Sequence, residues 1–209
     1  MSVITLDDVR AALNLSEFDA EVAQLHMAPN PRNFRPPPET PPRQAGVLVL
    51  LYPEDELRVL LTRRTANIRD HSGQISFPGG KRDPNDESFT ATALREACEE
   101  LGICDQPMTV LGELTPIYIP PSHFEVHPVV AAMDTVPHVT PNPAEVEEAF
   151  SLPLCHLLDH SIKRTETRDF NGTLVDIPYY AVNGHQVWGA TAIMLSELEH
   201  RLRAVVESR

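Results

Sequence analysis

The stretch that decides the fold is residues 94–103, which read LREACEELGI. Apolar side chains recur at every fourth position through this stretch and the residues before it, a spacing typical of one buried helix face. Gly102 follows as a natural helix end. The pattern predicts a helix from about Ser88 to Leu101, with core-facing side chains at Phe89, Ala93, Ala97 and Leu101.

The acidic side chains of this predicted helix fall on one edge. Helical geometry places Glu96 and Glu100 about 40° apart around the axis, with Glu99 adjacent. Neighbouring carboxylates repel one another unless cations lie between them, and Mg²⁺ prefers oxygen ligands. The alternative is a solvated surface helix, but the helix contains no lysine and its only base is Arg95. We interpret Arg95 as a structural partner of Glu99 or of another nearby acid.

A Pro-Gly-Gly turn precedes the acidic helix. Residues 77–81 read FPGGK, and their backbone can approach a ligand closely because glycine lacks a Cβ. Alone, such a sequence marks only a turn. In front of an acidic helix, Gly79 and Gly80 are interpreted as part of a metal cradle.

Composition narrows the class of protein. The chain has 209 residues, of which 42% are hydrophobic and 22% charged, as expected for one soluble globular domain. A net charge of −13 argues against a nucleic-acid partner, which usually requires clustered Lys and Arg. No apolar run predicts a membrane span, and the N-terminus lacks the pattern of a secretory signal. We expect a cytoplasmic protein in which Cys98, Cys104 and Cys155 stay reduced.

The rest of the chain divides into an appendage and a main domain. Residues 1–44 are expected to form two short helices, begun by Thr5 and Ser16, and then a proline-rich linker. Residues 45–209 are expected to form the main domain, a mixed sheet that ends in an amphipathic helix over 190–206. Expected strands cover residues 45–52, 57–64, 108–119, 124–133, 154–158 and 179–182.

Residues 80–103 resemble the Nudix box. Every defined position matches from Arg95-Glu96 to Gly102-Ile103, whereas the loop after Gly80 is one residue longer than the general pattern. Counted back from Arg95, Glu87 takes the place of the first acid of the box. The chain also resembles the coenzyme A pyrophosphatase branch of Nudix hydrolases at residues 60–65, 69, 73, 77–80, 122–128, 142–146 and 188–191.

The resemblance implies an α/β fold, the Nudix-type α/β/α sandwich with a mixed β-sheet. It also implies metal-dependent hydrolysis of the diphosphate bond of coenzyme A or its thioesters. Glu96, Glu99 and Glu100 would hold Mg²⁺ or Mn²⁺ and act in catalysis, with the Gly80 carbonyl as a further ligand. Gly79, Arg95 and Gly102 would be structural parts of the motif.

Nudix enzymes also recruit an acid from a later loop. Within residues 141–150, PNPAEVEEAF, our choice for this catalytic acid is Glu145, with Glu147 and Glu148 as alternatives. The competing interpretation is a set of solvated acids at the start of a strand or helix.

Three arginines are candidates for substrate binding. Coenzyme A carries a 3′-phosphate besides its diphosphate, and the planar fork of arginine suits phosphate, so we expect at least one of Arg63, Arg64 and Arg69 to contact substrate. The alternative is that they cap strands or pair with Asp70 and Asp83. Trp188, farther along the chain, is interpreted as a packing residue.

Other functions remain open at this point. The same fold would act on another diphosphate, such as ADP-ribose or a dinucleoside polyphosphate, or would bind a nucleotide without cleaving it. A third alternative treats the acidic helix as an interaction surface. The expected partner is a small molecule, and the expected oligomeric state is a monomer or homodimer.

Overall fold

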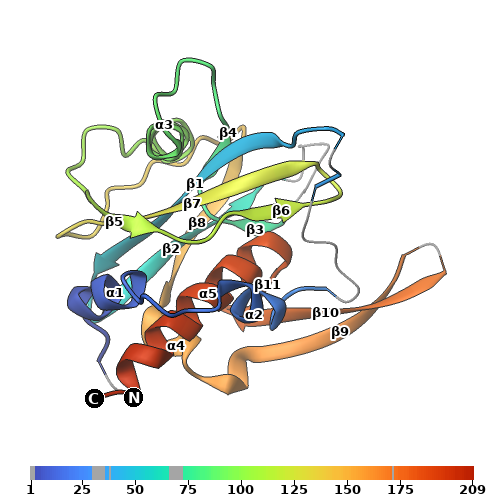
Figure 1. Cartoon of the computed structure of the whole chain (residues 1–209). Helices are drawn as coiled ribbons and strands as arrows, with labels where there is room; N and C mark the ends of the chain where they lie inside the picture. The colour runs from blue at the N-terminus through green and yellow to red at the C-terminus, as the bar shows by residue number, and fades with distance from the viewer. Residues whose placement is uncertain (1–2, 30–35, 38, 66–72, 171) are drawn as a thin grey trace.

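The computed structural model describes residues 3–29, 36–37, 39–65, 73–170 and 172–209. They form a large mixed sheet with helices on both faces and a smaller three-stranded sheet, which lies at the bottom of Figure 1. This architecture confirms the predicted α/β sandwich with a mixed sheet. The candidate substrate-binding residue Arg69 lies outside the described residues.

The large sheet is organised around β1 (Arg43–Pro53), which lies between β2 (Leu57–Arg64) and β7 (Phe124–Ala132). β1 and β7 run parallel, whereas the other described pairs of this sheet run antiparallel. The remaining strands are β3 (Ile75–Ser76), β4 (Gly79–Lys81), β5 (Thr109–Glu113), β6 (Ile117–Ile119) and β8 (Val146–Pro153). β4 pairs with the first part of β1, which places the Pro-Gly-Gly turn in the sheet.

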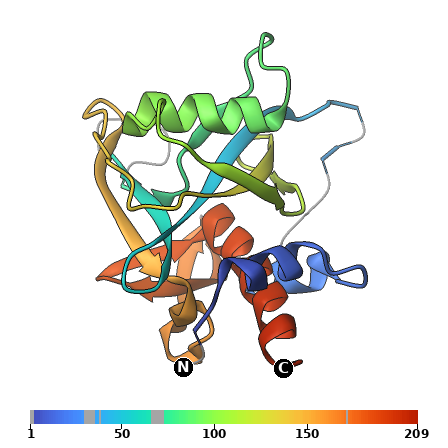
Figure 2. The ribbon, with the colours of Figure 1, turned by 90° about the vertical axis from the view of Figure 1, so that its left-hand side faces the viewer.

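The two faces of the large sheet bury separate cores. α3 (Phe89–Leu101) covers one face, and α5 (Gly189–Val206) covers the other together with the N-terminal helices, as Figure 2 shows. Alternate side chains of β1 belong to the two cores, as the pleat of a strand requires. α5 confirms the helix predicted over residues 190–206. Among the described residues, no helix is both long and apolar enough to cross a membrane.

The N-terminal helices α1 (Leu6–Leu13) and α2 (Ala20–Leu25) pack on α5. α1 begins with the predicted capping box of Thr5 and Asp8. α2 is capped by Asp19 instead of the predicted Ser16, because the Asp19 carboxylate accepts a first-turn N–H at 3.0 Å. Side chains of α1 join the core beneath α5, so this segment is packed against the main domain. The domain boundary at residue 44 stays a prediction.

The C-terminal part differs from the sequence prediction in two places. Residues expected as a strand form helix α4 (Leu154–Leu157), because Pro153 at its N-cap ends β8. A second sheet contains β9 (Lys163–Phe170), β10 (Thr173–Val182) and β11 (His185–Trp188), after the short helix η1 (His160–Ile162). Only residues 179–182 of this sheet were predicted, because β9 reads KRTETRDF and shows no apolar alternation.

Cys98 and Cys104 form a disulfide, which corrects the expectation that all three cysteines are reduced. Cys98 lies in α3, and the chain reverses at Gly102, whose φ of 67° is the left-handed conformation that glycine adopts without strain. The reversal returns Cys104 to the helix end. Cys155 is free and buried.

Candidate active site

The acidic helix α3 forms for local reasons. The Ser88 hydroxyl accepts the Ala91 N–H at 3.1 Å and caps the first turn. At the other end, the Gly102 N–H donates to the Cys98 carbonyl at 2.8 Å. The apolar face packs on the sheet with Ala93, Ala97 and Leu101 fully buried, so the acids are left on the edge that faces β4 and the loop before β8.

Glu100 is the most buried acid of α3, with 3% of its area exposed. Its Oε2 accepts the Gly79 N–H at 3.3 Å, and Arg64 Nη1 lies 3.6 Å from its Oε1. Burial raises the pKa of Glu100 to about 7, and Arg64 and the Gly79 N–H oppose that shift only in part. Glu100 is therefore a buried carboxyl group without a full set of partners.

Glu96 lies against the Pro-Gly-Gly turn. Burial raises its pKa, while its hydrogen bond with Arg95 works in the opposite direction. A Cβ at Gly80 would overlap the Glu96 carboxylate, and a Cβ at Gly79 would lie 2.6 Å from the Val47 Cα. Gly79 therefore requires glycine, because the atoms that a Cβ would meet belong to the backbone, whereas a Cβ at Gly80 would displace the Glu96 carboxylate.

Arg95 binds the acids around it. Its guanidinium lies 2.7 Å from Glu96, 3.4 Å from Glu99 and 2.9 Å from Asp86. The hydrogen bond from Arg95 holds the pKa of Asp86 well below its usual range, and Asp86 in turn raises the pKa of Arg95. Arg95 thus ties the loop before α3 to the helix, which supports its structural interpretation.

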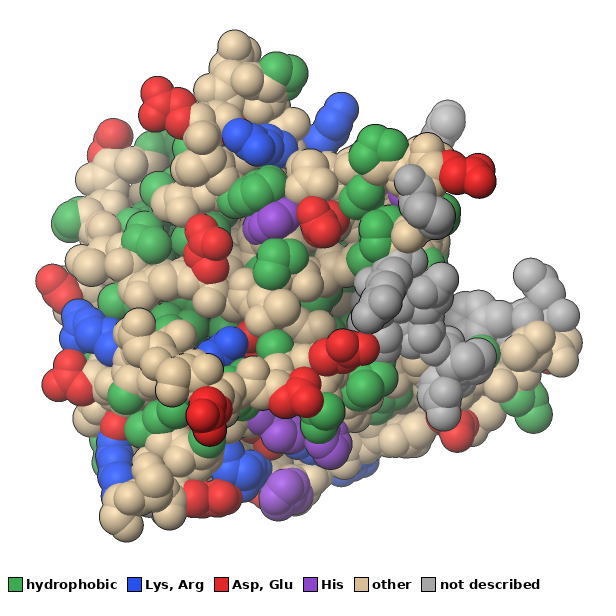
Figure 3. Space-filling view, in the orientation of Figure 1, with side chains coloured by type: hydrophobic (Ala, Val, Ile, Leu, Met, Phe, Trp, Pro, Cys, Tyr) green, Lys and Arg blue, Asp and Glu red, His purple; other side chains and the backbone are tan. Residues whose placement is uncertain are grey.

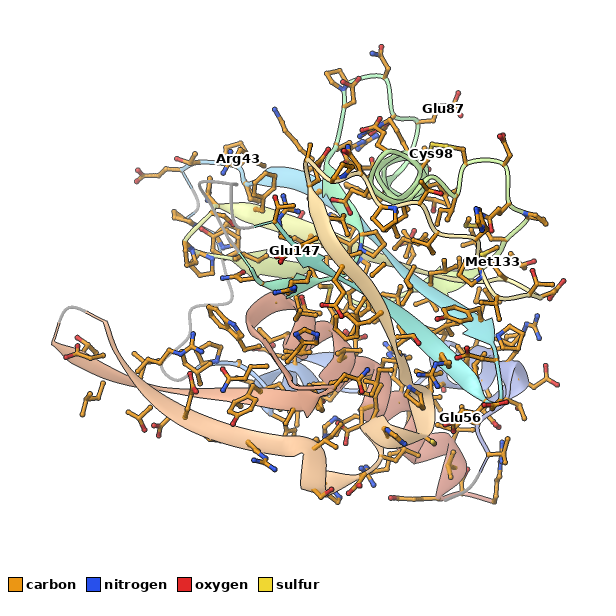
Figure 4. All side chains as sticks on the ribbon, turned by 180° about the vertical axis from the view of Figure 1, so that it is seen from behind. Arg43, Glu56, Glu87, Cys98, Met133 and Glu147 are labelled. Atoms are coloured by element: carbon orange, nitrogen blue, oxygen red, sulfur yellow. A yellow bond between two sulfur atoms is a disulfide. The ribbon has the colours of Figure 1, made fainter. Side chains whose placement is uncertain are left out.

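The partner of Arg95 is Asp86, not Glu87. Counted back from Arg95, Glu87 has the spacing of the Nudix box, but counted forward from Gly80 the acid is Asp86. Glu87 is exposed and lies at the outer edge of the molecule (Figure 4). The extra residue of the loop therefore lies after Asp86, and the spacing from the glycine is the signal that would have identified it.

Glu145 lies beside the acids of α3. Its charge contributes to the raised pKa of both Glu96 and Glu100. The Thr65 N–H donates to the Glu145 carbonyl at 3.0 Å, and the Asn142 side-chain amide donates to its Oε1 at 3.3 Å. These bonds hold the residue at the start of β8.

The alternatives to Glu145 are engaged elsewhere. Glu147 and Glu148 lie 3.0 Å and 3.2 Å from Arg63. Arg63, a candidate for substrate binding, is thus paired with these two acids. Glu147 is labelled near the middle of Figure 4. Of the two candidate arginines that the structure describes, only Arg64 approaches the acids of α3.

A cleft opens beside the acids. It consists of two adjoining cavities, of about 640 Å³ and 600 Å³. They share the lining residues Val47, Arg64, Gly79, Ile119, Pro121 and Val126. The smaller cavity is bordered by Arg43, Lys81 and the backbone of Gly80. The larger one is lined mainly by apolar side chains from both sheets and from α5, among them Phe77, Ile177, Trp188 and Met194.

Sequence reasoning missed several residues of this cleft. Arg43 and Lys81 stand at strand ends without a motif of their own, and only the pairing of β1 with β4 brings them together. Trp188 was interpreted as a packing residue, but its ring borders the apolar cavity and Arg168 lies 4.8 Å from its centroid. The signal for Trp188 was its place in residues 188–191, which resemble the coenzyme A pyrophosphatase branch.

The oxygen-rich edge of α3 suits a divalent cation. Carboxylates of Glu96, Glu99, Glu100 and Glu145 and the Gly80 carbonyl are all oxygen donors, and a cation would relieve the raised pKa of the buried ones. In the described structure no three of these carboxylates present oxygens within 4.8 Å of one another. Since Arg95 holds Glu96 and Glu99, an ion bound to both must compete with it.

A group away from α3 does gather three metal-type ligands within 4.8 Å in the described part of the chain: Glu56, Cys155 and His156. It lies at the opposite end of the molecule from α3, where Figure 4 labels Glu56. The Cys155 thiol already donates to the Glu56 carboxylate at 2.7 Å. The group is therefore separate from the cleft.

Comparisons with known proteins agree with this geometry. A model of the NUDIX domain matches residues 42–171. A Photorhabdus laumondii protein described as an uncharacterized Nudix hydrolase, NudL, is 35% identical over 191 residues, which cover 91% of this chain and 99% of that protein. NudL of Yersinia pestis (strain Pestoides F) is 35% identical over 162 residues, or 77% of this chain and 80% of that one.

A solved structure shares the fold. The MutT protein from Methanosarcina mazei Go1 superposes with a TM-score of 0.51 and 22% identity, covering 78% of this chain and 96% of its own. The family match, the 35% identity to two relatives and the acidic helix behind a Gly-Gly turn lead to one conclusion. This chain belongs to the Nudix hydrolase family, whose enzymes use divalent metal ions to hydrolyse pyrophosphate bonds in nucleoside diphosphate derivatives.

Proposed function

We propose that this Nudix hydrolase cleaves the diphosphate bond of coenzyme A or its thioesters. The products are 3′,5′-adenosine diphosphate and 4′-phosphopantetheine or its acyl derivative. The observation that carries the proposal is the two-part cleft, in which a basic cavity and an apolar cavity meet at Gly79 and Arg64, next to Glu100. Coenzyme A has the same division, with a multiply phosphorylated nucleotide at one end and a long, weakly polar arm at the other.

The basic cavity supports a substrate with more than one phosphate group. Acidic side chains are spread over the face shown in Figure 3, and the chain has a net charge of −13, so three cations at one cleft form a local exception. Among the described residues, Arg43 and Lys81 have no carboxylate within 4.0 Å. Cations without acidic partners are available to a phosphate group.

The apolar cavity supports a substrate with an extended weakly polar arm. Its volume of about 640 Å³ is that of a small-molecule site. Side chains of β3, β10 and α5 converge there, and Ile177 is almost fully buried at its wall. A thioester-linked acyl group would extend the same arm and bury further apolar surface.

The acids of α3 would hold the metal ions. We assign Glu96, Glu99, Glu100 and the Gly80 carbonyl to Mg²⁺ or Mn²⁺, which neutralise phosphate charge and lower the pKa of water when they are bound. We assign Glu145 to accept the proton of the attacking water. Glu96 and Glu100 are engaged by arginines, whereas the side chain of Glu145 contacts the Asn142 amide.

Product analysis by mass tests the proposal. The enzyme is incubated with coenzyme A, a fatty-acyl thioester, dephospho-coenzyme A, ADP-ribose and a dinucleoside polyphosphate, each with Mg²⁺ and with chelator. We expect 4′-phosphopantetheine or its acyl derivative, no product with chelator, and a higher KM for dephospho-coenzyme A. Preferential cleavage of ADP-ribose or of the dinucleoside polyphosphate would overturn the substrate assignment. Metal-stimulated binding without any cleavage would overturn the catalytic one.

A further inference from the structure

The disulfide between Cys98 and Cys104 lies within the catalytic helix region and not at a remote surface. The bond joins residues six apart, and the segment that it closes contains Glu99, Glu100 and the helix-ending Gly102. Cys98 is half-buried, whereas Cys104 is exposed to solvent. The exposed Cys104 therefore offers a thiol in solution access to a bond that constrains the end of α3, where Figure 4 labels Cys98.

The segment that follows the disulfide holds the loop before β8. The Gln106 side-chain amide donates to the His138 carbonyl at 2.7 Å, and the His138 N–H donates to Gln106 Oε1 at 2.8 Å. Both bonds depend on the position of residues 104–106 after the helix. The disulfide fixes that position covalently.

The same loop is bonded to the last carbonyls of α3. The Thr140 N–H donates to the Leu101 carbonyl and the Asn142 N–H to the Glu100 carbonyl, both at 2.8 Å. Asn142 in turn accepts the Glu145 N–H at 3.0 Å and donates its amide to the Glu145 carboxylate at 3.3 Å. A continuous set of hydrogen bonds thus runs from the disulfide-closed helix end to Glu145.

We propose that Cys98–Cys104 is a site of reversible thiol–disulfide exchange, and that the disulfide form is the more active enzyme because it holds the loop that carries Glu145. Leu101 and Ile103 are almost fully buried, so reduction leaves α3 folded. It frees the exposed segment after the helix and loosens the loop. Since a misplacement of about 1 Å can cost about 10²-fold in rate, we expect loosening to lower kcat about tenfold with little change in KM.

The exchange requires two thiol groups of a reductant. The first thiolate attacks Sγ of the exposed Cys104, the Cys98–Cys104 bond breaks, and Cys98 leaves with the electron pair and takes a proton. The second thiol attacks the mixed disulfide and releases Cys104 as a thiol. Two reductant thiols become one disulfide, and two electrons and two protons pass to the protein.

Turnover in two defined redox states tests the proposal. The probe is dithiothreitol, the substrate is whichever diphosphate the enzyme cleaves best, and Mg²⁺ is saturating. Thiol titration of denatured protein verifies the states, with one free thiol, that of Cys155, before reduction and three after it. We expect the reduced enzyme to have about one tenth of the kcat, consistent with the cost of a loosened catalytic group.

Variants separate the disulfide from other effects of the reductant. The double variant Cys98→Ser/Cys104→Ser should match the reduced enzyme and ignore dithiothreitol, whereas Cys155→Ser should respond as the wild type does. Three free thiols in the air-oxidised protein, equal kcat in both redox states, or full activity of the double variant would each overturn the proposal. In Glu145→Gln, reduction should make no further difference, and a remaining effect would overturn the route through Glu145.

The test depends on the diphosphate hydrolysis of the family and on the assignment of Glu145, not on coenzyme A. A preference for another diphosphate would contradict the substrate proposal, and the two redox states would then be compared with that other substrate. Equal kcat in the two redox states with coenzyme A as a good substrate would contradict only the redox proposal.

Discussion

Two helices on opposite faces of the same sheet, α3 and α5, each carry a buried acid, Glu100 and Glu199, but the two acids differ in how closely charged partners approach them. Glu199 of α5 is fully buried and receives hydrogen bonds from Lys163 at 2.7 Å, Arg203 at 2.9 Å and Tyr180 at 2.8 Å. Burial alone would raise the pKa of Glu199. The hydrogen bonds from Lys163, Arg203 and Tyr180 together outweigh burial, and the pKa of Glu199 lies below the ordinary value.

Glu100 of α3 is buried to almost the same degree but remains poorly neutralised. Its contacts are a backbone N–H at 3.3 Å and Arg64 at 3.6 Å, and its pKa is raised to about 7. Burial therefore does not distinguish a structural acid from a functional one. The number and length of the charged contacts do, because a carboxylate kept short of partners is ready for a cation.

The largest effect is expected on the stability of the α5 side. Glu199→Ala should lower the free energy of unfolding by about 3–5 kcal/mol, because it leaves the largely buried side chains of Lys163 and Arg203 without their acid. Urea denaturation measures the change. Glu207→Ala is the matched control, since Glu207 pairs with the same Arg203 at 3.6 Å but is 67% exposed, and should cost less than about 0.5 kcal/mol. Equal losses of unfolding free energy in both variants would mean that the buried acid Glu199 does not stabilise the fold more than the exposed acid Glu207.

The α3 side should respond in the opposite way. Glu100→Gln should lower kcat at saturating Mg²⁺ by about 10²–10³-fold, the scale of losing one charged transition-state contact, without lowering the metal-free stability. Steady-state kinetics and urea denaturation of the same preparation measure both quantities. Glu87→Gln is the control, because Glu87 is an exposed acid just before the helix. Unchanged turnover in Glu100→Gln would mean that α3 is not the metal-binding element.

The sequence predicts α3 well because each of its determinants is local. The cap at Ser88, the four-residue apolar spacing and Gly102 all lie within 15 residues, and the acids follow from the helical repeat. The choice of Glu145 over its neighbours also agrees with the geometry, although its catalytic role stays a proposal. What the sequence does not predict depends on distant contacts. The basic border at Arg43 and Lys81 exists only because β1 pairs with β4.

The partners of Glu199 were not predictable from the sequence either. Lys163 lies in β9, which has no apolar alternation, so neither the strand nor the ion pair leaves a local pattern. The sequence assigned the first acid of the Nudix box to Glu87, but the acid that contacts Arg95 is Asp86. The loop has one extra residue, so counting back from Arg95 gives Glu87, whereas counting forward from Gly80 gives Asp86. The disulfide requires the chain to reverse at Gly102, and cysteine spacing alone does not reveal that reversal.

A pH titration sharpens the comparison further. Because the folded pKa of Glu100 is about 7, above its ordinary 4.5, the stability that it contributes is fully present below pH 4.5 and is lost as pH rises through 7. At about 1.36 kcal/mol per pKa unit, this carboxyl alone should account for about 3 kcal/mol in metal-free enzyme.

Thermal denaturation with chelator against pH measures this loss, and the Glu100→Gln variant should lack it. Saturating Mg²⁺ should remove it in the wild type, because an ion that binds the ionised folded form stabilises that form. Parallel pH profiles of the wild type and the variant in chelator would contradict the assignment of the raised pKa to Glu100.

The smallest predicted effect extends the comparison from acids to cations. Lys163 and Arg203 are held by a buried acid, whereas the Arg43 guanidinium borders the cleft, lies 4.1 Å from the centroid of the Phe124 ring and donates to the Ser122 carbonyl. Arg43→Gln should raise the KM for coenzyme A about tenfold and leave kcat unchanged. The tenfold rise corresponds to the loss of one charged contact that contributes about 1.4 kcal/mol to substrate binding. Arg10→Gln, on the surface of α1, is the charge-matched control. The same rise with dephospho-coenzyme A would mean that Arg43 contacts the diphosphate. A rise confined to coenzyme A would assign it to the 3′-phosphate, because only that group differs between the two substrates.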